Sequence, residues 1–405
     1  MLTQRSTQKR SLDIRHLIID PGETSLQANG LAIVARRLAD EQMRAGYSVI
    51  LFYLLNTPLE ETNDITGVPI RCVLMTGTKM GGRFVRLDAH VIDALTAEAT
   101  DNTIFHIHHG RDPLLISITS EFRRRGIPYA MTIHGRYSHI FDQDNHVVRV
   151  LPALYLRFIE RWVLEAARFV HVVTPAEQEI VRRIAPRTVC ELIFHAAYSS
   201  RSDGIPQESA RKSPSSRFPS FGFCGRYVIE HKGLDLLLGG FAEYRRGGGK
   251  GTLELVGLGP AREQLAAMAD SLAVGKYCQI GGPLFGEDKK RVLQTWDFFV
   301  TPSRYDVFPT ASLEAARLGL PLIASKSTGF ADHIVDSLSG FVIEELSPHA
   351  VAKALFLAER ISADEWARMS RAAFNMAVSM GDWSAIAARL VDLYQRPGAS
   401  KAPSV

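Results

Sequence analysis

The feature that most constrains the fold is a regular alternation of short, β-branched apolar runs with longer segments of helical period. In the first half the apolar runs are LIID, VILFYL, IFHIHH, YAMTIH, FVHVVT and CELIFH, and helix-period segments lie at 28–45, 113–125 and 151–168. Strand, helix and strand at this spacing are typical of parallel α/β sheets. The first half therefore predicts a doubly wound α/β domain.

The alternation stops in 199–220, SSRSDGIPQESARKSPSSRFPS, where Ser, Pro and charged residues dominate as they do in linkers. It then restarts with the runs FGFCGR, TLELVG, CQIGG, FFVTPS and PLIAS, between helix-period segments at 233–246, 260–272, 286–295 and 311–318. A chain of 405 residues is long enough for two such domains. We expect an N-terminal domain at 12–199, a linker at 200–216, a C-terminal domain at 217–380 and a last helix at 381–396.

Composition excludes several classes of protein. The cysteines are widely spaced and form no C-x-x-C pair, which argues against a disulfide framework or zinc knot and favours a reducing compartment. No apolar run is long enough to span a bilayer, and the basic N-terminus lacks the apolar segment of a signal peptide. The net charge of +4 is modest. We expect a cytoplasmic protein without a nucleic-acid partner.

The stretch SRYDVFPTASLEAARLGLPLIAS, 303–325, follows the apolar run FFVTPS and so lies at the carboxyl end of a predicted strand, where parallel sheets bind ligands. Asp306 lies in the loop, Thr310 is the expected N-cap, and Glu314 lies early in the helix, where the helix dipole favours a negative charge. The helix N-terminus offers N–H groups to a phosphate, and carboxylates accept hydrogen bonds from sugar hydroxyls. The stretch suits two sugars joined by a diphosphate; the alternative is a turn-capping Asp306 and a solvated Glu314.

A second stretch, FGFCGRYVIEHKGLDLLLGGFAEY, places two cations near a strand end. Gly225 allows close backbone approach, Arg226 presents a planar fork, and Lys232 presents a compact charge. Cations placed in advance at this position stabilise a diphosphate leaving group as its negative charge grows. The alternative is a pair of surface cations that flank a loop.

These motifs, in this order and spacing, resemble a known family. GR…KGLDLLL, LELVGLGP and the acid pair around FPTASLEAARLGLPLIAS are similar to the C-terminal half of retaining glycosyltransferases of the GT-B fold, family GT4. NGLAIVARRLADEQMRAGYSVILFYL, FHIHHG, IPYAMTIHG, VHVVTPAEQEIV and DWSAIAARLVDLY resemble segments of the remaining chain. The resemblance implies two Rossmann-like domains that face each other across a cleft, with a C-terminal helix that crosses back to the first domain.

The resemblance also implies roles for individual residues. Arg226 and Lys232, beside Gly225, would bind the donor diphosphate. Glu314 would hold the ribose hydroxyls, and Asp306 would contact the hydroxyls of the transferred sugar. In further positions, Thr310 would add a backbone N–H to the phosphate site, Gly30 would let the first domain approach the phosphates, and His134 would lie near the reacting face of the sugar.

Two positions depart from the family pattern. Asp306 replaces the usual Glu and is one methylene shorter, which alters the expected sugar contact. The usual Gly-Gly-x-Gly loop is reduced to Ala28-Asn29-Gly30, which weakens the expected phosphate contact. His106, His108 and His109 suggest a metal, but no further ligand has suitable local spacing, and the family needs no tightly bound metal or other cofactor.

We therefore expect a retaining glycosyltransferase that moves a sugar from a nucleotide-diphosphate sugar to a glycan, lipid-linked or small-molecule acceptor, in polysaccharide or glycoconjugate biosynthesis. The acceptor would be selected by loops of the first domain, such as 56–84 and 136–150. Basic residues there fit peripheral association with the inner face of the membrane. The alternatives are a non-catalytic nucleotide-sugar-binding protein of the same fold, or a GT-B epimerase or phosphorylase.

Overall fold

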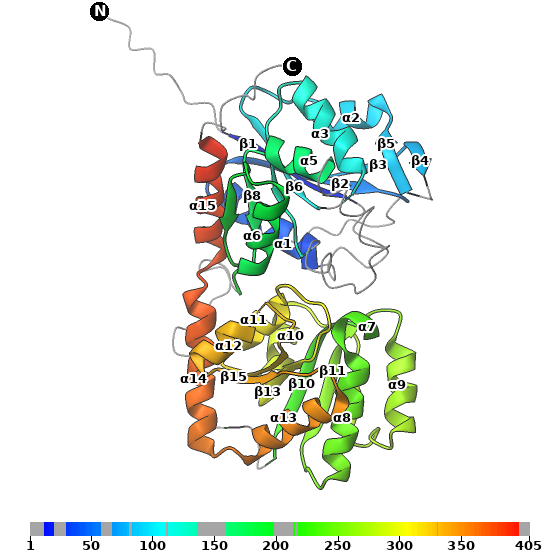
Figure 1. Cartoon of the computed structure of the whole chain (residues 1–405), viewed down its shortest axis with the longest axis vertical. Coiled ribbons are helices and arrows are strands. Elements are labelled where there is room, and N and C mark those ends of the chain that lie inside the picture. Colours follow the sequence, from blue (N-terminus) through cyan, green and yellow to red (C-terminus); the bar gives the residue numbers. More distant parts are fainter. Residues whose placement is uncertain are drawn as a thin grey trace, which may run out of the picture. The chain divides into compact units, whose positions relative to one another are not determined.

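The computed structural model describes residues 12–19, 30–57, 67–80, 83–110, 112–135, 159–197, 214, 218–329 and 331–396 (Figure 1). The chain divides into two compact units. The first comprises Met1–Ile193 and Ser384–Val405, and the second comprises Phe194–Trp383. The predicted linker at 200–216 and the predicted acceptor loop at 136–150 lie almost entirely outside the described residues.

The first unit is built on a seven-stranded parallel sheet of order β3-β2-β1-β6-β7-β8-β9. Its strands are β1 (Asp13–Ile19), β2 (Ser48–Leu55), β3 (Ile70–Leu74), β6 (Thr103–His108), β7 (Tyr129–Thr132), β8 (Val170–Val172) and β9 (Cys190–Leu192). Its helices are α1 (Gly30–Arg44), α2 (Ala89–Thr96), α3 (Leu114–Arg124), α5 (Arg161–Ala166), α6 (Pro175–Ile184) and most of α15 (Trp383–Gln395).

The second unit contains a six-stranded parallel sheet of order β12-β11-β10-β13-β14-β15. Its strands are β10 (Ser220–Arg226), β11 (Thr252–Leu258), β12 (Cys278–Ile280), β13 (Phe298–Thr301), β14 (Leu322–Ser325) and β15 (Gly340–Ile343). Its helices are α7 (Ile229–Lys232), α8 (Leu234–Arg246), α9 (Arg262–Ser271), α10 (Gly286–Leu293), α11 (Thr310–Arg317), α12 (Ala331–Ser337), α13 (Pro348–Arg360) and α14 (Ala363–Ser379).

Both sheets have the doubly wound order in which the chain adds strands to one side and then reverses to the other side of the first strand. The predicted doubly wound α/β class is confirmed for both units. Central strands read as nearly continuous apolar runs because helices cover both faces: six of the seven residues of β1 are buried. The reversal points, between β1 and β6 and between β10 and β13, are where such sheets bind ligands.

Local sequence signals fix several helix starts. Thr174 and Ser347 accept hydrogen bonds from the backbone three residues on, and a proline follows each of them. Ser362 and Glu365 form a reciprocal capping box at the start of α14. None of the described helices combines the length and the hydropathy needed to cross a bilayer.

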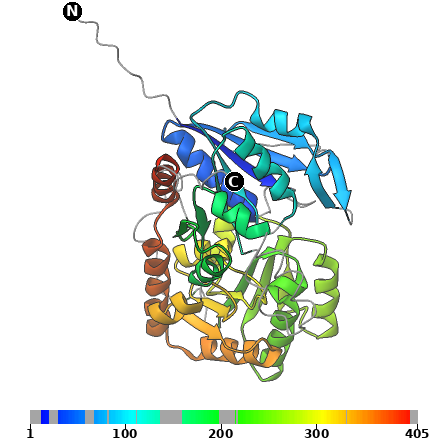
Figure 2. The ribbon, with the colours of Figure 1, turned by 45° about the horizontal axis from the view of Figure 1, so that its top comes forward.

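The last helix, α15, packs within the first unit, as the resemblance implied (Figures 1 and 2). Its Tyr394 is fully buried, and the Tyr394 hydroxyl lies 3.5 Å from Nε2 of Gln42 on α1. The Arg389 guanidinium pairs with Glu191 of β9 at 3.1 Å. Residues far apart in the sequence therefore share one core.

Two local expectations need correction. The segment 56–84, expected as a loop, contains β3 and the start of an antiparallel hairpin, β4 (Gly77–Met80) with β5 (Arg83–Leu87). Gly77 allows this pairing, since an added Cβ would meet the Arg86 carbonyl oxygen at 2.0 Å. Thr310 is the first residue of α11 rather than its N-cap. Pro309 is the N-cap, and its carbonyl accepts the N–H of Ser312 at 3.0 Å.

Candidate functional site in the second unit, with a histidine network in the first

The candidate donor site lies at the reversal point of the second sheet. β10 and β13 are neighbours there, and the segments that follow their carboxyl ends carry most of the predicted site residues. Arg226 is the last residue of β10, and Lys232 ends α7 just beyond. Asp306 follows β13, and Glu314 lies in α11. The sheet order thus brings together residues that are up to 88 positions apart in the sequence.

A glycine determines where Lys232 lies. Gly233 joins α7 to α8 with φ of +60°, in the left-handed region. A Cβ at this position would meet the Pro302 carbonyl oxygen at 2.1 Å, so the joint packs directly on the segment that follows β13. The Lys232 ammonium consequently contacts the Asp306 carboxylate, and both side chains are largely buried.

Further contacts hold these two segments together. The His231 carbonyl accepts N–H groups from Arg304 at 3.0 Å and from Tyr305 at 3.2 Å. The Arg304 guanidinium pairs with both oxygens of Asp235 at 2.7 Å, which holds the pKa of that carboxyl below its ordinary value. A bidentate pair fixes orientation as well as distance. These contacts therefore fix the segment that carries Lys232 against the segment that carries Asp306.

Glu314 has a cationic partner that the sequence reasoning missed. The Lys289 ammonium, from α10, contacts the Glu314 carboxylate, and both side chains are partly exposed. The sequence EDKKR of α10 gave no signal to separate Lys289 from its solvated neighbours. Only the contact between α10 and Glu314 of α11 in the folded chain identifies it.

The Cys224 thiol, on β10, lies close enough to three of these charged groups for its pKa to be affected by them. Burial raises the pKa of this thiol, and the charges of Lys289, Glu314 and Lys232 also act on that pKa. Arg226 lies two positions further along the strand, on the same face as Cys224, with an exposed side chain. The structure thus gathers Lys232, Asp306, Glu314 and Lys289 at one sheet edge, with Arg226 at the end of β10.

The backbone around this edge is close-packed. An added Cβ at Gly225 would meet the Phe223 ring at 3.0 Å, and one at Gly257 would meet the Gly225 carbonyl oxygen at 1.9 Å. β10 and β11 therefore approach each other closely where they end. The first N–H groups of α11, which start at Thr310, point out of that helix as an anion-binding end.

In the first unit, His134 follows β7 in a left-handed conformation with φ of +46°. The next residue, Gly135, donates its N–H to the Glu177 carboxylate, which also accepts the N–H of Val173 at 3.1 Å. Burial raises the pKa of Glu177 to about 7. Glu177, whose segment the resemblance covered without giving it a role, therefore anchors the turn that carries His134.

The remaining first-unit prediction concerns Gly30, which begins α1 after residues 20–29, outside the described range. No atom lies within 4 Å of a Cβ added at Gly30. The structure thus leaves room for a close approach at this position.

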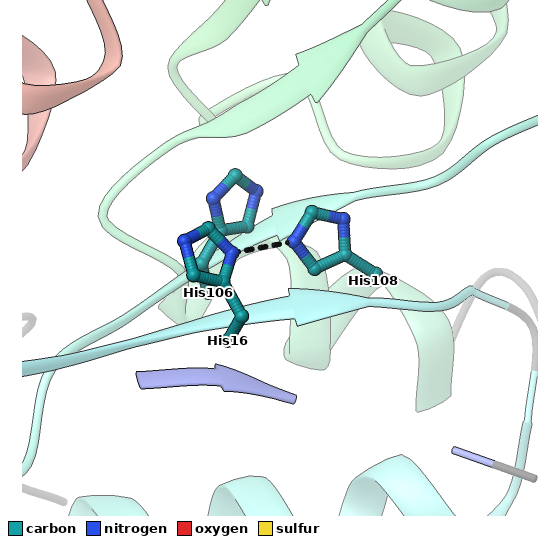
Figure 3. Close-up of side chains that lie close together, drawn as sticks. All are labelled: His16, His106 and His108. Carbon is teal, nitrogen blue, oxygen red and sulfur yellow. Dashed lines mark hydrogen bonds between the residues drawn. The ribbon is translucent and has the colours of Figure 1, made fainter. Parts of the chain in front are cut away.

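Three buried histidines, His16, His106 and His108, lie together on β1 and β6 (Figure 3). Their strands pair in register, with His16 opposite His106. The rings stack within 20–29° of parallel, with centroids 4.4–5.4 Å apart. A metal binds in the plane of each imidazole ring, and lone pairs in stacked, nearly parallel planes do not converge on one point. The arrangement instead suits hydrogen bonding, and the Nδ1 of His16 lies 2.8 Å from Nε2 of His108.

Two doubly wound α/β domains in one chain are the architecture of the GT-B class of fold. Residues 29–193 match the family model described as "Glycosyl transferase 4-like domain", and residues 206–376 match "Glycosyl transferases group 1". The chain belongs to the GT-B glycosyltransferases of the GT4 type.

Among curated proteins, the chain is 26% identical over 244 residues to the uncharacterized glycosyltransferase YqgM of Bacillus subtilis (strain 168), covering 60% of this chain and 65% of that protein. It is 29% identical over 206 residues to glycogen synthase 2 of Nitrosococcus oceani, covering 48% of this chain and 39% of that protein. The matched region therefore spans less than two thirds of either relative.

Among solved structures, the fold is similar to sucrose-phosphate synthase from Thermosynechococcus elongatus, with a TM-score of 0.71 and 20% identity over 95% of this chain and 98% of that one. It is also similar to HepE of Anabaena in complex with UDP and glucose, with a TM-score of 0.69 and 15% identity over 94% and 98% of the two chains. At these identities the likeness concerns the fold.

Proposed function

We propose that this protein is a retaining glycosyltransferase that moves a sugar from a nucleotide-diphosphate sugar to a glycan, lipid-linked or small-molecule acceptor. The observation that carries the proposal is the charge cluster at the β10–β13 reversal point, where Lys232, Asp306, Glu314 and Lys289 surround one sheet edge. Binding of UDP and glucose by HepE, a structural neighbour, supports a donor of this kind.

The proposed roles are those that the family resemblance implies, and the charge of each group fits its role. Arg226 and Lys232 bind the diphosphate, and the N-terminus of α11 at Thr310 adds backbone N–H groups. Glu314 accepts hydrogen bonds from the ribose, and Asp306 accepts them from the transferred sugar. Because Lys232 already contacts Asp306, a bound diphosphate has to share that ammonium with a carboxylate.

The proposed reaction breaks the bond between the sugar C1 and the phosphate oxygen, through an oxocarbenium-like state. The leaving diphosphate gains negative charge as that bond breaks, so cations already in place favour the transition state over the bound donor. The acceptor oxygen attacks C1 from the face that the diphosphate leaves, and the departing phosphate oxygen takes the acceptor proton. In this proposal the first unit binds the acceptor and supplies His134. Side-chain cations, rather than a bound metal ion, stabilise the negative charge on the leaving diphosphate.

A two-stage experiment tests the proposal. Thermal unfolding with UDP-, GDP-, ADP- and CMP-sugars identifies the donor, since a ligand that binds the native state raises its Tm. The selected donor is then incubated with candidate acceptors, and NMR reads the anomeric configuration of the product. We expect transfer with retained configuration, and an inverted product would overturn the mechanism.

The same experiment separates the alternatives. Tight donor binding without transfer to any acceptor would identify a non-catalytic nucleotide-sugar-binding protein. An epimerised sugar, formed with no acceptor present, would identify an epimerase. Transfer of the sugar to inorganic phosphate would identify a phosphorylase.

A further inference from the structure

In the first unit, a chain of hydrogen-bonded buried side chains ends at His134. Its role rests on the proposed function, in which His134 lies near the reacting face of the sugar. The chain includes four other histidines: His16 on β1, His106 and His108 on β6, and His171 on β8. All four are fully buried. Figure 3 shows three of them, with the hydrogen bond between His16 and His108.

Burial favours the neutral form of these four histidines. Burial lowers the pKa of His16 and of His171 to about 4. Burial, with repulsion from neighbouring imidazoles, lowers the pKa values of His106 and His108 well below the ordinary value. A neutral imidazole has one N–H donor and one acceptor nitrogen, so a donor assigned on one side fixes the other side as an acceptor.

The direction of the chain is set at a backbone carbonyl. The carbonyl oxygen of Ile193 can only accept, so His171 donates to it from Nε2 at 2.8 Å. Nδ1 of His171 then accepts from the Thr132 hydroxyl at 3.0 Å. The Thr132 oxygen in turn accepts from Nε2–H of His106 at 2.6 Å. Nδ1 of His106 is left to accept from the Tyr394 hydroxyl.

The direction continues through Gln42 to His134. The Tyr394 oxygen accepts from the Gln42 amide at 3.5 Å, which turns the amide oxygen toward Nε2–H of His16 at 2.7 Å. Nδ1 of His16 accepts from Nε2–H of His108 at 2.8 Å. Nδ1 of His108 then accepts from Nε2–H of His134 at 3.1 Å. The opposite direction would leave two acceptors facing each other at Ile193.

We propose that Gln42, His16 and His108 are positioning residues for sugar transfer, because they hold His134 with its proton on Nε2. Nδ1 is then the acceptor nitrogen of the His134 ring. The reverse tautomer would present an N–H at that nitrogen instead. The chain thus specifies which ring nitrogen of His134 accepts.

The tautomer itself can be read directly. Long-range proton–nitrogen correlation spectra of the full chain, with ¹⁵N-labelled histidine, distinguish Nε2–H from Nδ1–H imidazoles. We expect His16, His106, His108, His134 and His171 all to be Nε2–H tautomers at neutral pH. An Nδ1–H His134 would overturn the proposal whether or not the protein transfers sugar.

Paired substitutions at Gln42 test the functional consequence. Gln42→Leu keeps the volume but removes the acceptor for His16, so we expect His134 to lose its single tautomer and kcat to fall about tenfold, at unchanged KM for the donor. Gln42→Glu loses the donor to Tyr394 but keeps the acceptor oxygen for His16, so it should restore the tautomer and most of kcat. Loss of the tautomer in Gln42→Leu with unchanged kcat would overturn the positioning role.

A control separates this effect from damage to α1. Arg36, buried on the same helix, donates to the Tyr53 hydroxyl at 3.0 Å and takes no part in the chain. Arg36→Met should leave the His134 tautomer and kcat unchanged, and an equal loss of kcat there would also contradict the proposal. If no donor gives turnover in the wild type, the proposed function has failed, while the spectrum still decides the tautomer.

Discussion

The two units share a strand order but carry different chemistry at their reversal points. In the second unit, ammonium and carboxylate groups pair at the sheet edge while remaining partly open to solvent. In the first, fully buried imidazoles are kept neutral and joined by hydrogen bonds. Paired charges that keep some access to solvent can be redistributed by an incoming anion, whereas a buried neutral chain of hydrogen bonds keeps one arrangement. The ion pairs of the second unit can therefore rearrange around a charged ligand. The hydrogen-bond chain of the first unit holds each imidazole in one orientation and one tautomer.

The largest effect is expected from removing the second unit's cations. Arg226→Ala and Lys232→Ala should each lower kcat by about 10²-fold or more, because each removes a group that stabilises charge in the transition state. Steady-state kinetics with the donor found in the screen measures this. Lys326→Ala is the matched control, since Lys326 forms an exposed pair with Glu344 at 2.8 Å. Near-normal turnover in the Arg226 and Lys232 variants would remove the leaving-group role.

The first unit should respond to pH instead. Since the folded pKa of His16 and His171 is about 4, below the ordinary 6.5, the unfolded chain binds more protons, and stability falls as pH drops from 6.5 toward 4. Each of these histidines corresponds to roughly 3 kcal/mol at the acid end of that range. Glu177 acts in the opposite direction, because its raised pKa favours the folded state as pH falls from about 7. Because several buried histidines oppose one glutamate, we expect the free energy of unfolding to fall as the pH is lowered.

Scanning calorimetry between pH 8 and pH 5 measures this dependence. His16→Gln should show a shallower fall in Tm below pH 6.5 than the wild type. His349→Gln, which removes a largely exposed histidine of the second unit, should keep the wild-type slope. Equal slopes in all three proteins would mean that the buried histidines are not the source of the acid sensitivity.

A smaller effect is expected at the nucleoside end of the site. Glu314→Gln should weaken nucleotide binding by about tenfold, since it removes charge-assisted hydrogen bonds worth about 1.5–3 kcal/mol. Isothermal titration calorimetry with the nucleoside diphosphate measures the Kd, and Glu344→Gln is the exposed control. Unchanged affinity would assign Glu314 to its pair with Lys289 alone.

The sequence predicted much of the fold because local signals and topology agree. Apolar runs such as β1 are buried on both faces, and the segments after β10 and β13 necessarily meet at one edge once the sheets are parallel. Arg226, Lys232, Asp306 and Glu314 could therefore be placed near one another from the sequence.

The sequence could not predict which side chains contact each other across different helices and strands. The Lys232–Asp306 contact depends on how the Gly233 joint packs against the Pro302 carbonyl, which no local pattern encodes. His16 lies just before the apolar run LIID and gave no signal of its own, because its register with His106 is a property of two strands together. Lys289 looks like any solvated helix lysine until α10 is placed beside Glu314.

Asp306 gives the smallest effect and the sharpest test of the comparison, because its substitution should move two readouts in opposite directions. Asp306→Asn removes the carboxylate that shares Lys232, so nucleoside diphosphate binding should tighten by a few-fold, because the ammonium then serves the phosphate alone. The same change weakens the proposed contact with the transferred sugar, so kcat should fall. Calorimetry and kinetics on one preparation measure both. Weaker diphosphate binding would show that Asp306 orients Lys232 for the phosphate instead of competing for it, and the charge cluster would then be as fixed as the histidine chain.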